Sequence, residues 1–306
     1  RDPEMSRGLG DVYKRQKSNR SASIFPIGRR MMEGSAGMAS NLIILALQAP
    51  PAGFSVFAGF FIFKTIFAMF NPPTDRIAGK NVDFMATCLC DSIFPDAAKN
   101  AVQILRHFGA AVALPEDQTC CGQPAFNSGD FASARRVLRS AMRAFSAGAG
   151  PIVVPSASCA AMLYHSSKIA FRDSDEAERA AVDAFARRVW EFCDYLANVL
   201  GVGKIPGELD AKIAVHNSCH GRGSGTPAAL KKLLGSIDGV ELVEFDGSED
   251  CCGFGGTFSV VFPQLSSEMG EKKVRAIAAA EPDIVCAADT SCLMHQLSLI
   301  HISEPT

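Results

Sequence analysis

One cysteine pattern occurs twice in this chain of 306 residues, and it limits the possible folds more than any other feature. Cys88 is followed, after 31 intervening residues, by two adjacent cysteines and a glycine, and Cys219 is followed by the same arrangement after the same 31 residues. One more cysteine follows the first pair after 37 intervening residues and the second pair after 39. The pattern includes eight of the eleven cysteines: Cys88, Cys120, Cys121, Cys159, Cys219, Cys251, Cys252 and Cys292. Such self-similarity predicts two copies of one structural unit, offset by about 131 residues.

Strand-like and helix-like segments alternate in the same order around both sets of cysteines. Short apolar runs typical of strands lie at 81–88, 110–114, 151–155, 212–219, 240–245 and 283–288, and helical patterns lie at 95–109, 130–147, 226–237 and 263–280. A single long helix is predicted over 176–201, before a linker that contains glycine and proline. The alternation favours an α/β fold of two similar βαβ-type modules with mainly parallel sheets. We expect these modules at 80–165 and 211–296, joined by a helical connector and linker at 166–210.

The two ends of the chain differ in character from the modules. The opening RDPEMSRGLGDVYKRQ and the closing LSLIHISEPT resemble translated sequencing-adaptor read-through, so we expect 1–79 to be non-native or upstream sequence and 297–306 to be an adaptor-derived tail. The stretch 41–70 contains an apolar run long enough to cross a bilayer. We favour translated upstream DNA before a start at Met69 over a membrane segment. A membrane partner is then expected only if 41–70 is genuine.

Charge and cysteine usage exclude several classes of protein. The formal net charge is −2, so the chain carries no basic field that would collect nucleic acid. An odd number of cysteines, partly in adjacent pairs, argues against the disulfide framework of a secreted protein. In a reducing cytoplasm the same richness indicates metal ligation or redox chemistry, and we expect a cytoplasmic protein.

The cysteines of the pattern follow the ends of predicted strands. In a parallel α/β sheet these ends converge on one edge, where ligands bind. Four thiolates at one point fit an iron–sulfur cluster, and a glycine directly after each cysteine pair leaves room for the backbone to approach inorganic sulfide and donate an N–H to it. Two alternatives remain open. A structural zinc ion usually takes thiols from C-x₂-C pairs, which the chain lacks, and a metal-free dithiol site would leave the remote cysteines unexplained.

Other residues near the pattern are candidates for supporting roles. We expect Gly122, Gly253, His216 and His220 to lie close to the sulfur ligands, where the histidines could hydrogen-bond sulfur or shuttle a proton. The remaining cysteines are interpreted as core thiols: Cys193 in a helix, Cys286 in a strand, and Cys90 as a core residue or a neighbour of the site rather than a ligand.

Several long motifs resemble one known family. They are TCLCDSIFPDAAKNAVQILRHFGAAVALPEDQTCCGQPAFNSGD, PSASCAAM, NSCH, DCCGFGGTFSV and SCLMH. They are similar to the cysteine-rich CCG-domain family of iron–sulfur proteins and, within it, to the lactate utilization protein A family, which is related to the CCG-domain subunit of heterodisulfide reductase. The resemblance covers about 82–296. One departure matters, because the family's motif ends in C-x₂-C, whereas this chain has Ser156 and Asp289 at the first of those positions.

The resemblance implies a function and a ligand set. It implies that the two groups of four cysteines in the pattern hold one or two 4Fe–4S clusters, and that the chain relays electrons while a three-protein system oxidises L-lactate to pyruvate. The expected partners are a ferredoxin-like iron–sulfur subunit and a third subunit, and the chain alone is not expected to be active. Alternatives are a thiol–disulfide redox subunit like heterodisulfide reductase, an electron-transfer subunit for another 2-hydroxy acid such as glycolate, and a zinc-stabilised scaffold.

Overall fold

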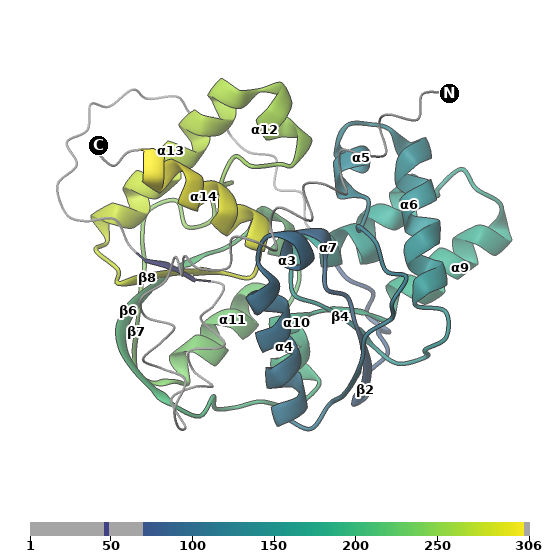
Figure 1. The fold of residues 1–306 in the computed structure, drawn as a ribbon, viewed down its shortest axis with the longest axis horizontal. Coiled ribbons are helices and arrows are strands. Elements are labelled where there is room, and N and C mark those ends of the chain that lie inside the picture. The colour runs from purple at the N-terminus through teal and green to yellow at the C-terminus, as the bar shows by residue number, and fades with distance from the viewer. Residues whose placement is uncertain (1–45, 49–69, 303–306) are drawn as a thin grey trace, which may run out of the picture.

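The computed structural model describes residues 46–48 and 70–302 as two four-stranded sheets with helices packed around them (Figure 1). One sheet has the strand order β3-β2-β4-β5, and all of its neighbouring strands are parallel. The other has the order β1-β8-β6-β7, with β6 parallel to both neighbours and β1 antiparallel to β8. The predicted α/β fold with two similar modules and mainly parallel sheets is therefore confirmed.

Both modules contain the same succession of elements. The first contains β2 (Asn81–Phe84), α3 (Cys88–Ser92), α4 (Pro95–His107), β3 (Ala111–Ala113), α5 (Gln123–Asn127), α6 (Phe131–Ala144), β4 (Ile152–Val154) and α7 (Ala157–Ala161). The second contains β6 (Glu208–His216), the 3₁₀ turn η4 (Cys219–Gly221), α11 (Thr226–Gly235), β7 (Asp238–Val243), α12 (Thr257–Val261), α13 (Pro263–Ala279), β8 (Ile284–Ala287) and α14 (Thr290–Ile302). Between them lie the π-helical turn η3 (Met162–Ser166), α8 (Ser167–Ala170), α9 (Glu176–Ala186), β5 (Val189–Glu191) and α10 (Phe192–Asn198).

Local sequence signals set the ends of the principal helices. Helix α4 starts at Pro95, whose fixed φ suits the first helical turn, and the chain leaves it through Gly109 at φ 84°. Helix α6 is capped by Asp130, whose carboxylate accepts a hydrogen bond from the backbone N–H of Ser133. Proline again occupies the first turn in α11 and α13. The helices that were predicted around the cysteines therefore form close to where their capping residues place them.

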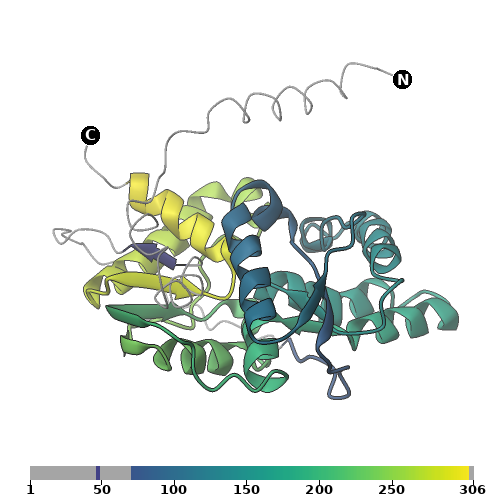
Figure 2. The same ribbon diagram turned by 60° about the horizontal axis from the view of Figure 1, so that its bottom comes forward.

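The largest core lies between the two sheets. It unites apolar side chains of β2, α4, α10, β6 and α11 in one buried cluster, and Figures 1 and 2 show α4 between the two halves of the molecule. Alternate residues of β4 serve different cores, because Val153 packs into this central cluster whereas Ile152 and Val154 pack against the outer helices of the first module. This alternation is the period of two expected of a strand that is buried on both faces. The two modules thus share one core.

The prediction of one long helix over 176–201 is wrong. The segment forms α9, then the strand β5, and then α10. Strand β5 extends the first sheet by pairing in parallel with β4, and all three of its residues are buried. Its Val-Trp-Glu sequence suits a strand, and the side chain of Glu191 caps α10 by accepting from the backbone N–H of Asp194 at 3.0 Å. Pairing with a distant strand outweighs the helical pattern of the local sequence.

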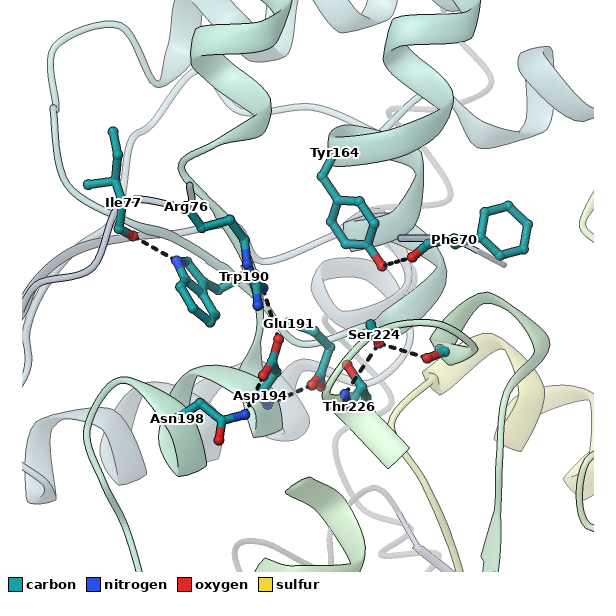
Figure 3. A network of polar contacts seen from close by, with 11 residues as sticks. Phe70, Arg76, Ile77, Tyr164, Trp190, Glu191, Asp194, Asn198, Ser224 and Thr226 are labelled. Atoms are coloured by element: carbon teal, nitrogen blue, oxygen red, sulfur yellow. Dashed lines mark hydrogen bonds and ion pairs between the residues drawn. The ribbon is translucent and has the colours of Figure 1, made fainter. Parts of the chain in front are cut away.

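Residues 70–77 pack along this part of the first module (Figure 3). The Arg76 guanidinium lies 3.4 Å from the centre of the Trp190 ring and makes a 2.8 Å ion pair with Asp194. The Trp190 indole N–H donates to the Ile77 carbonyl, and the Tyr164 hydroxyl donates to the Phe70 carbonyl. These contacts fix the segment that leads into β2.

The apolar stretch 41–70 lies outside the described residues except for β1 (Ala46–Gln48) and Phe70. In β1, Ala46 pairs with Cys286 of β8 in antiparallel register. Across 46–48 and 70–302, no helix is both long enough and apolar enough to cross a bilayer.

Candidate metal centres

The fold carries the cysteines of each module to the ends of its parallel strands. In the first module, Cys88 opens α3 just after β2, the Cys120-Cys121 pair lies between β3 and α5, and Cys159 lies in α7 just after β4. The second module repeats this placement around β6, β7 and β8, with Cys219 in η4 and Cys292 in the first turn of α14. Carboxyl ends of neighbouring parallel strands meet at one sheet edge, so each set of four thiols gathers at one point.

The first group of thiols is in mutual contact. The sulfur atoms of Cys88 and Cys120 are 3.8 Å apart, and the Gly122 backbone N–H donates to the Cys120 sulfur at 3.5 Å. Hydrogen bonds from the Cys121 and Cys88 thiols lower the pKa of Cys120, whereas contacts with Cys120 and Cys159 raise the pKa of buried Cys121. The group therefore favours one thiolate and opposes the ionisation of further thiols. A bound metal cation would stabilise the additional thiolates.

The second group repeats this arrangement. The Gly253 N–H donates to the Cys251 sulfur at 3.4 Å. Hydrogen bonds from Cys219 and Cys252 lower the pKa of Cys251, and contacts with Cys251 and Cys292 raise the pKa of Cys252. The eight predicted ligands therefore form two separate groups of four, one in each module.

The glycines after both cysteine pairs adopt the left-handed conformation that glycine tolerates. Gly122 has φ 87° and Gly253 has φ 88°. This turn aims each glycine N–H at the thiol sulfur of the cysteine two residues earlier. Donation of these N–H groups to inorganic sulfide stays a prediction.

The two predicted histidines take different positions. His220 lies at the seam between the modules: its Nδ1 is 3.3 Å from the Cys219 sulfur, its Nε2 is 3.1 Å from the Gln123 amide nitrogen, and its ring stacks on Phe70 at 4.5 Å. His216 is buried at the end of β6, and its ring lies with the sulfur atoms of Cys252 and Cys292. Burial lowers the pKa of both imidazoles, that of His216 to about 3.

The three cysteines outside the pattern lie in the core. Cys193 and Cys286 belong to the central apolar cluster. Cys90 is fully buried in α3, with its sulfur 3.9 Å from the Thr290 hydroxyl of the second module.

The two positions that depart from the family's C-x₂-C motif meet at the seam. The Ser156 hydroxyl is 3.3 Å from the Asp289 carboxylate, which also accepts from the Ser158 backbone N–H at 2.7 Å. The other oxygen of Asp289 accepts from the Ser291 N–H at 3.0 Å. A fully buried carboxylate therefore caps the helices that carry Cys159 and Cys292, one from each module.

Sequence reasoning missed Lys273, which is buried beside the second group of thiols. Its ammonium donates to the carbonyls of Gly247 and Ser248, and burial lowers its pKa to about 8. Its helical spacing could have identified it, because Lys273 lies on the same helical face as Gly270 and Ile277, which are also buried.

Comparisons with known proteins agree with this architecture. The cysteine-rich domain known as CCG matches residues 82–164 and 213–296, one match in each module. Lactate utilization protein A 2 of Bacillus cereus strain Q1 is 37% identical over 234 residues, which cover 73% of this chain and 96% of that protein. Lactate utilization protein A of an Exiguobacterium species is 37% identical over 236 residues, and lactate utilization protein A 1 of Bacillus anthracis is 36% identical over 234 residues, with the same coverage. The chain therefore belongs to the lactate utilization protein A family of CCG-domain proteins.

Proposed function

We propose that the chain is an iron–sulfur electron-transfer subunit of a multi-protein system that oxidises L-lactate to pyruvate. The observation that carries the proposal is the duplicated group of four thiols at the strand ends, in a chain whose relatives are lactate utilization proteins. Oxidation of lactate to pyruvate releases two electrons and two protons. An iron–sulfur cluster, when bound, accepts and passes on electrons one at a time.

The residues present fit a 4Fe–4S cluster in each module. Thiolates are the usual ligands of such clusters, and each module supplies four: Cys88, Cys120, Cys121 and Cys159 in the first, and Cys219, Cys251, Cys252 and Cys292 in the second. The second member of each pair and the last cysteine of each set are buried, whereas Cys88 is exposed and Cys120, Cys219 and Cys251 are half-buried, so each site is open to solvent on one side. Backbone N–H groups aimed at sulfur stabilise the negative charge of a cluster and raise its reduction potential.

The chain needs partners for the complete reaction. In 70–302, the glycine-rich turn Gly253–Gly256 is part of the second cysteine loop rather than a dinucleotide site. We therefore assign the lactate-oxidising chemistry to the complex, with a ferredoxin-like iron–sulfur subunit and a third subunit as partners. Eleven free thiols suit a reducing compartment, so the proposed location is the cytoplasm.

One distance favours a second candidate function, that of a zinc-stabilised scaffold. With metal–sulfur bonds of about 2.3 Å, two ligands of a tetrahedral zinc ion are roughly 3.8 Å apart. The sulfur atoms of Cys88 and Cys120 have this separation. A zinc ion in the first module would hold the fold together without carrying electrons.

Anaerobic purification of the full chain, with iron, sulfide and zinc counted and low-temperature EPR recorded, tests the proposal. We expect about four to eight irons per chain, matching sulfide, and an EPR signal on reduction. Reconstitution with the partner subunits should then give lactate-dependent reduction of that signal. Zinc without sulfide would refute the redox function and support the scaffold.

A further inference from the structure

The two centres differ at a position that the repeat makes equivalent. His216 precedes Cys219 by three residues, and Met85 precedes Cys88 by three residues. Both side chains are buried where the central strand of their module ends. The repeat therefore places a nitrogen donor beside the second group of thiols and a weakly coordinating thioether beside the first.

His216 has no hydrogen-bond partner within the part of the chain that the structure describes. Both ring nitrogens are buried, and neither meets a donor or an acceptor. Buried polar groups are almost always paired, so an imidazole left without a partner calls for an explanation. A ligand absent from the structure would supply the missing contact.

The ring is placed to reach such a ligand. One nitrogen of His216 and the sulfur atoms of Cys252 and Cys292 all lie within 4.8 Å of one another. Atoms this close can share one metal ion after small movements, because metal–nitrogen bonds are about 2.0–2.1 Å and metal–sulfur bonds about 2.3 Å. The neutral imidazole is the form that binds metals.

Two charged side chains near this site, those of Lys273 and Asp289, make hydrogen bonds to backbone groups rather than to the ring of His216. Lys273 donates to the carbonyls of Gly247 and Ser248. Asp289 accepts from backbone N–H groups of Ser158 and Ser291. Neither group hydrogen-bonds the ring of His216.

We infer that His216 is a fifth donor of the second centre, binding through one ring nitrogen the metal group held by Cys219, Cys251, Cys252 and Cys292. The first centre then has thiolate ligands alone. This inference rests on the proposed function for the identity of the group as an iron–sulfur cluster.

The test uses the full-length protein purified anaerobically, once with natural histidine and once with ¹⁵N-histidine. Pulsed EPR of the reduced protein should show a hyperfine coupling from a nitrogen bound directly to iron, and the coupling should change with the isotope. It should vanish in His216→Met, which copies the first module, and persist in His107→Met, an exposed control on α4.

Two results overturn the inference. One is an iron-loaded wild-type protein with no directly bound nitrogen, which requires no variant to fold and leaves the proposed function intact. The other is a coupling that survives in His216→Met. A protein that holds zinc and no iron refutes the proposed function instead. Zinc K-edge absorption then decides the inference: imidazole scattering that His216→Met removes supports it, and its absence from the wild type refutes it.

Discussion

Three glycines share almost the same backbone conformation but have different surroundings, and together they test how the second cysteine loop is held. Gly109, Gly122 and Gly253 have φ of 84°, 87° and 88°. A Cβ on Gly109 would meet nothing within 4 Å, and on Gly122 its closest neighbours would be 3.4 and 3.5 Å away. On Gly253 it would lie 2.6 Å from the Ser266 carbonyl oxygen and 2.9 Å from the Met269 Cβ.

The expected losses of stability follow from these contacts. Alanine in the left-handed region costs about 1–2 kcal/mol, and this cost applies to all three positions. Gly109→Ala should lose only this backbone contribution to stability. Gly122→Ala should lose little more, because the contacts of the new Cβ at position 122 are ordinary or slightly tight. Gly253→Ala adds overpacking against α13, typically about 1–3 kcal/mol, because the closest atoms belong to backbone and a Cβ that cannot rotate away. It should therefore unfold at a temperature lower than Gly109→Ala by roughly 2–12 °C.

Far-UV circular dichroism melts of the three anaerobically purified variants measure the difference, and an iron count of each sample reports on the sites. Gly253→Ala should also lose about half of the bound iron, because the Cys251-Cys252 loop must move away from α13. The melts of Gly109→Ala supply the baseline for the shared backbone term. Equal melting temperatures for Gly253→Ala and Gly109→Ala, with full iron in both, would refute the packing argument.

Three further outcomes are expected. Cys120→Ser and Cys251→Ser should each remove about half of the iron and sulfide, and their combination nearly all; iron that survives the double change would show that the thiols are not the ligands. Asp289→Asn should lower the free energy of unfolding by about 1–3 kcal/mol, because an amide N–H₂ would meet backbone N–H donors such as that of Ser158; denaturant melts that match the wild type would contradict this. Burial raises the pKa of Glu191 from its usual 4.5 to about 7, so its neutral form is favoured in the folded state. The contribution of Glu191 to the free energy of unfolding is complete below pH 4.5 and is lost as pH rises through 7, by up to about 3 kcal/mol. Glu191→Gln should flatten this decline of stability in melts from pH 5 to 8. An unchanged dependence of stability on pH would assign the decline to other groups.

Most of what could be predicted about the fold came from the repetition in the sequence. The equal spacing from Cys88 to Cys120 and from Cys219 to Cys251 indicated two equivalent units, and the apolar runs before the cysteines indicated strands. Because carboxyl ends of parallel strands share a sheet edge, topology alone brings each set of thiols together. Capping signals such as Pro95 placed the helices between the strands.

The parts that sequence reasoning missed depend on contacts between distant segments. Val189–Glu191 looks helical from its neighbours, and only the open edge of β4 makes it a strand. The burial of Lys273 depends on carbonyls of a loop 25 and 26 residues earlier. The meeting of Ser156 with Asp289 depends on how the two modules pack, and periodicity within one module carries no information about that packing.

The residues that differ between the repeats affect which of the two proposed centres is more easily reduced. If both centres had the same surroundings, an electron would have no preferred site. The second module instead has His216 where the register of the first has Met85, and Lys273 where the packing of α6 on Gly122 places Ala141, so positive charge and a nitrogen donor lie beside one centre and apolar side chains lie at the matching positions of the other. A nearby cation stabilises added negative charge, which favours reduction of the second centre. Asp289 opposes this effect only in part, since two backbone N–H donors hold its charge at the seam, where it faces both modules. If both sites hold clusters, as proposed, this divergence of the repeat favours electron movement from the first module to the second.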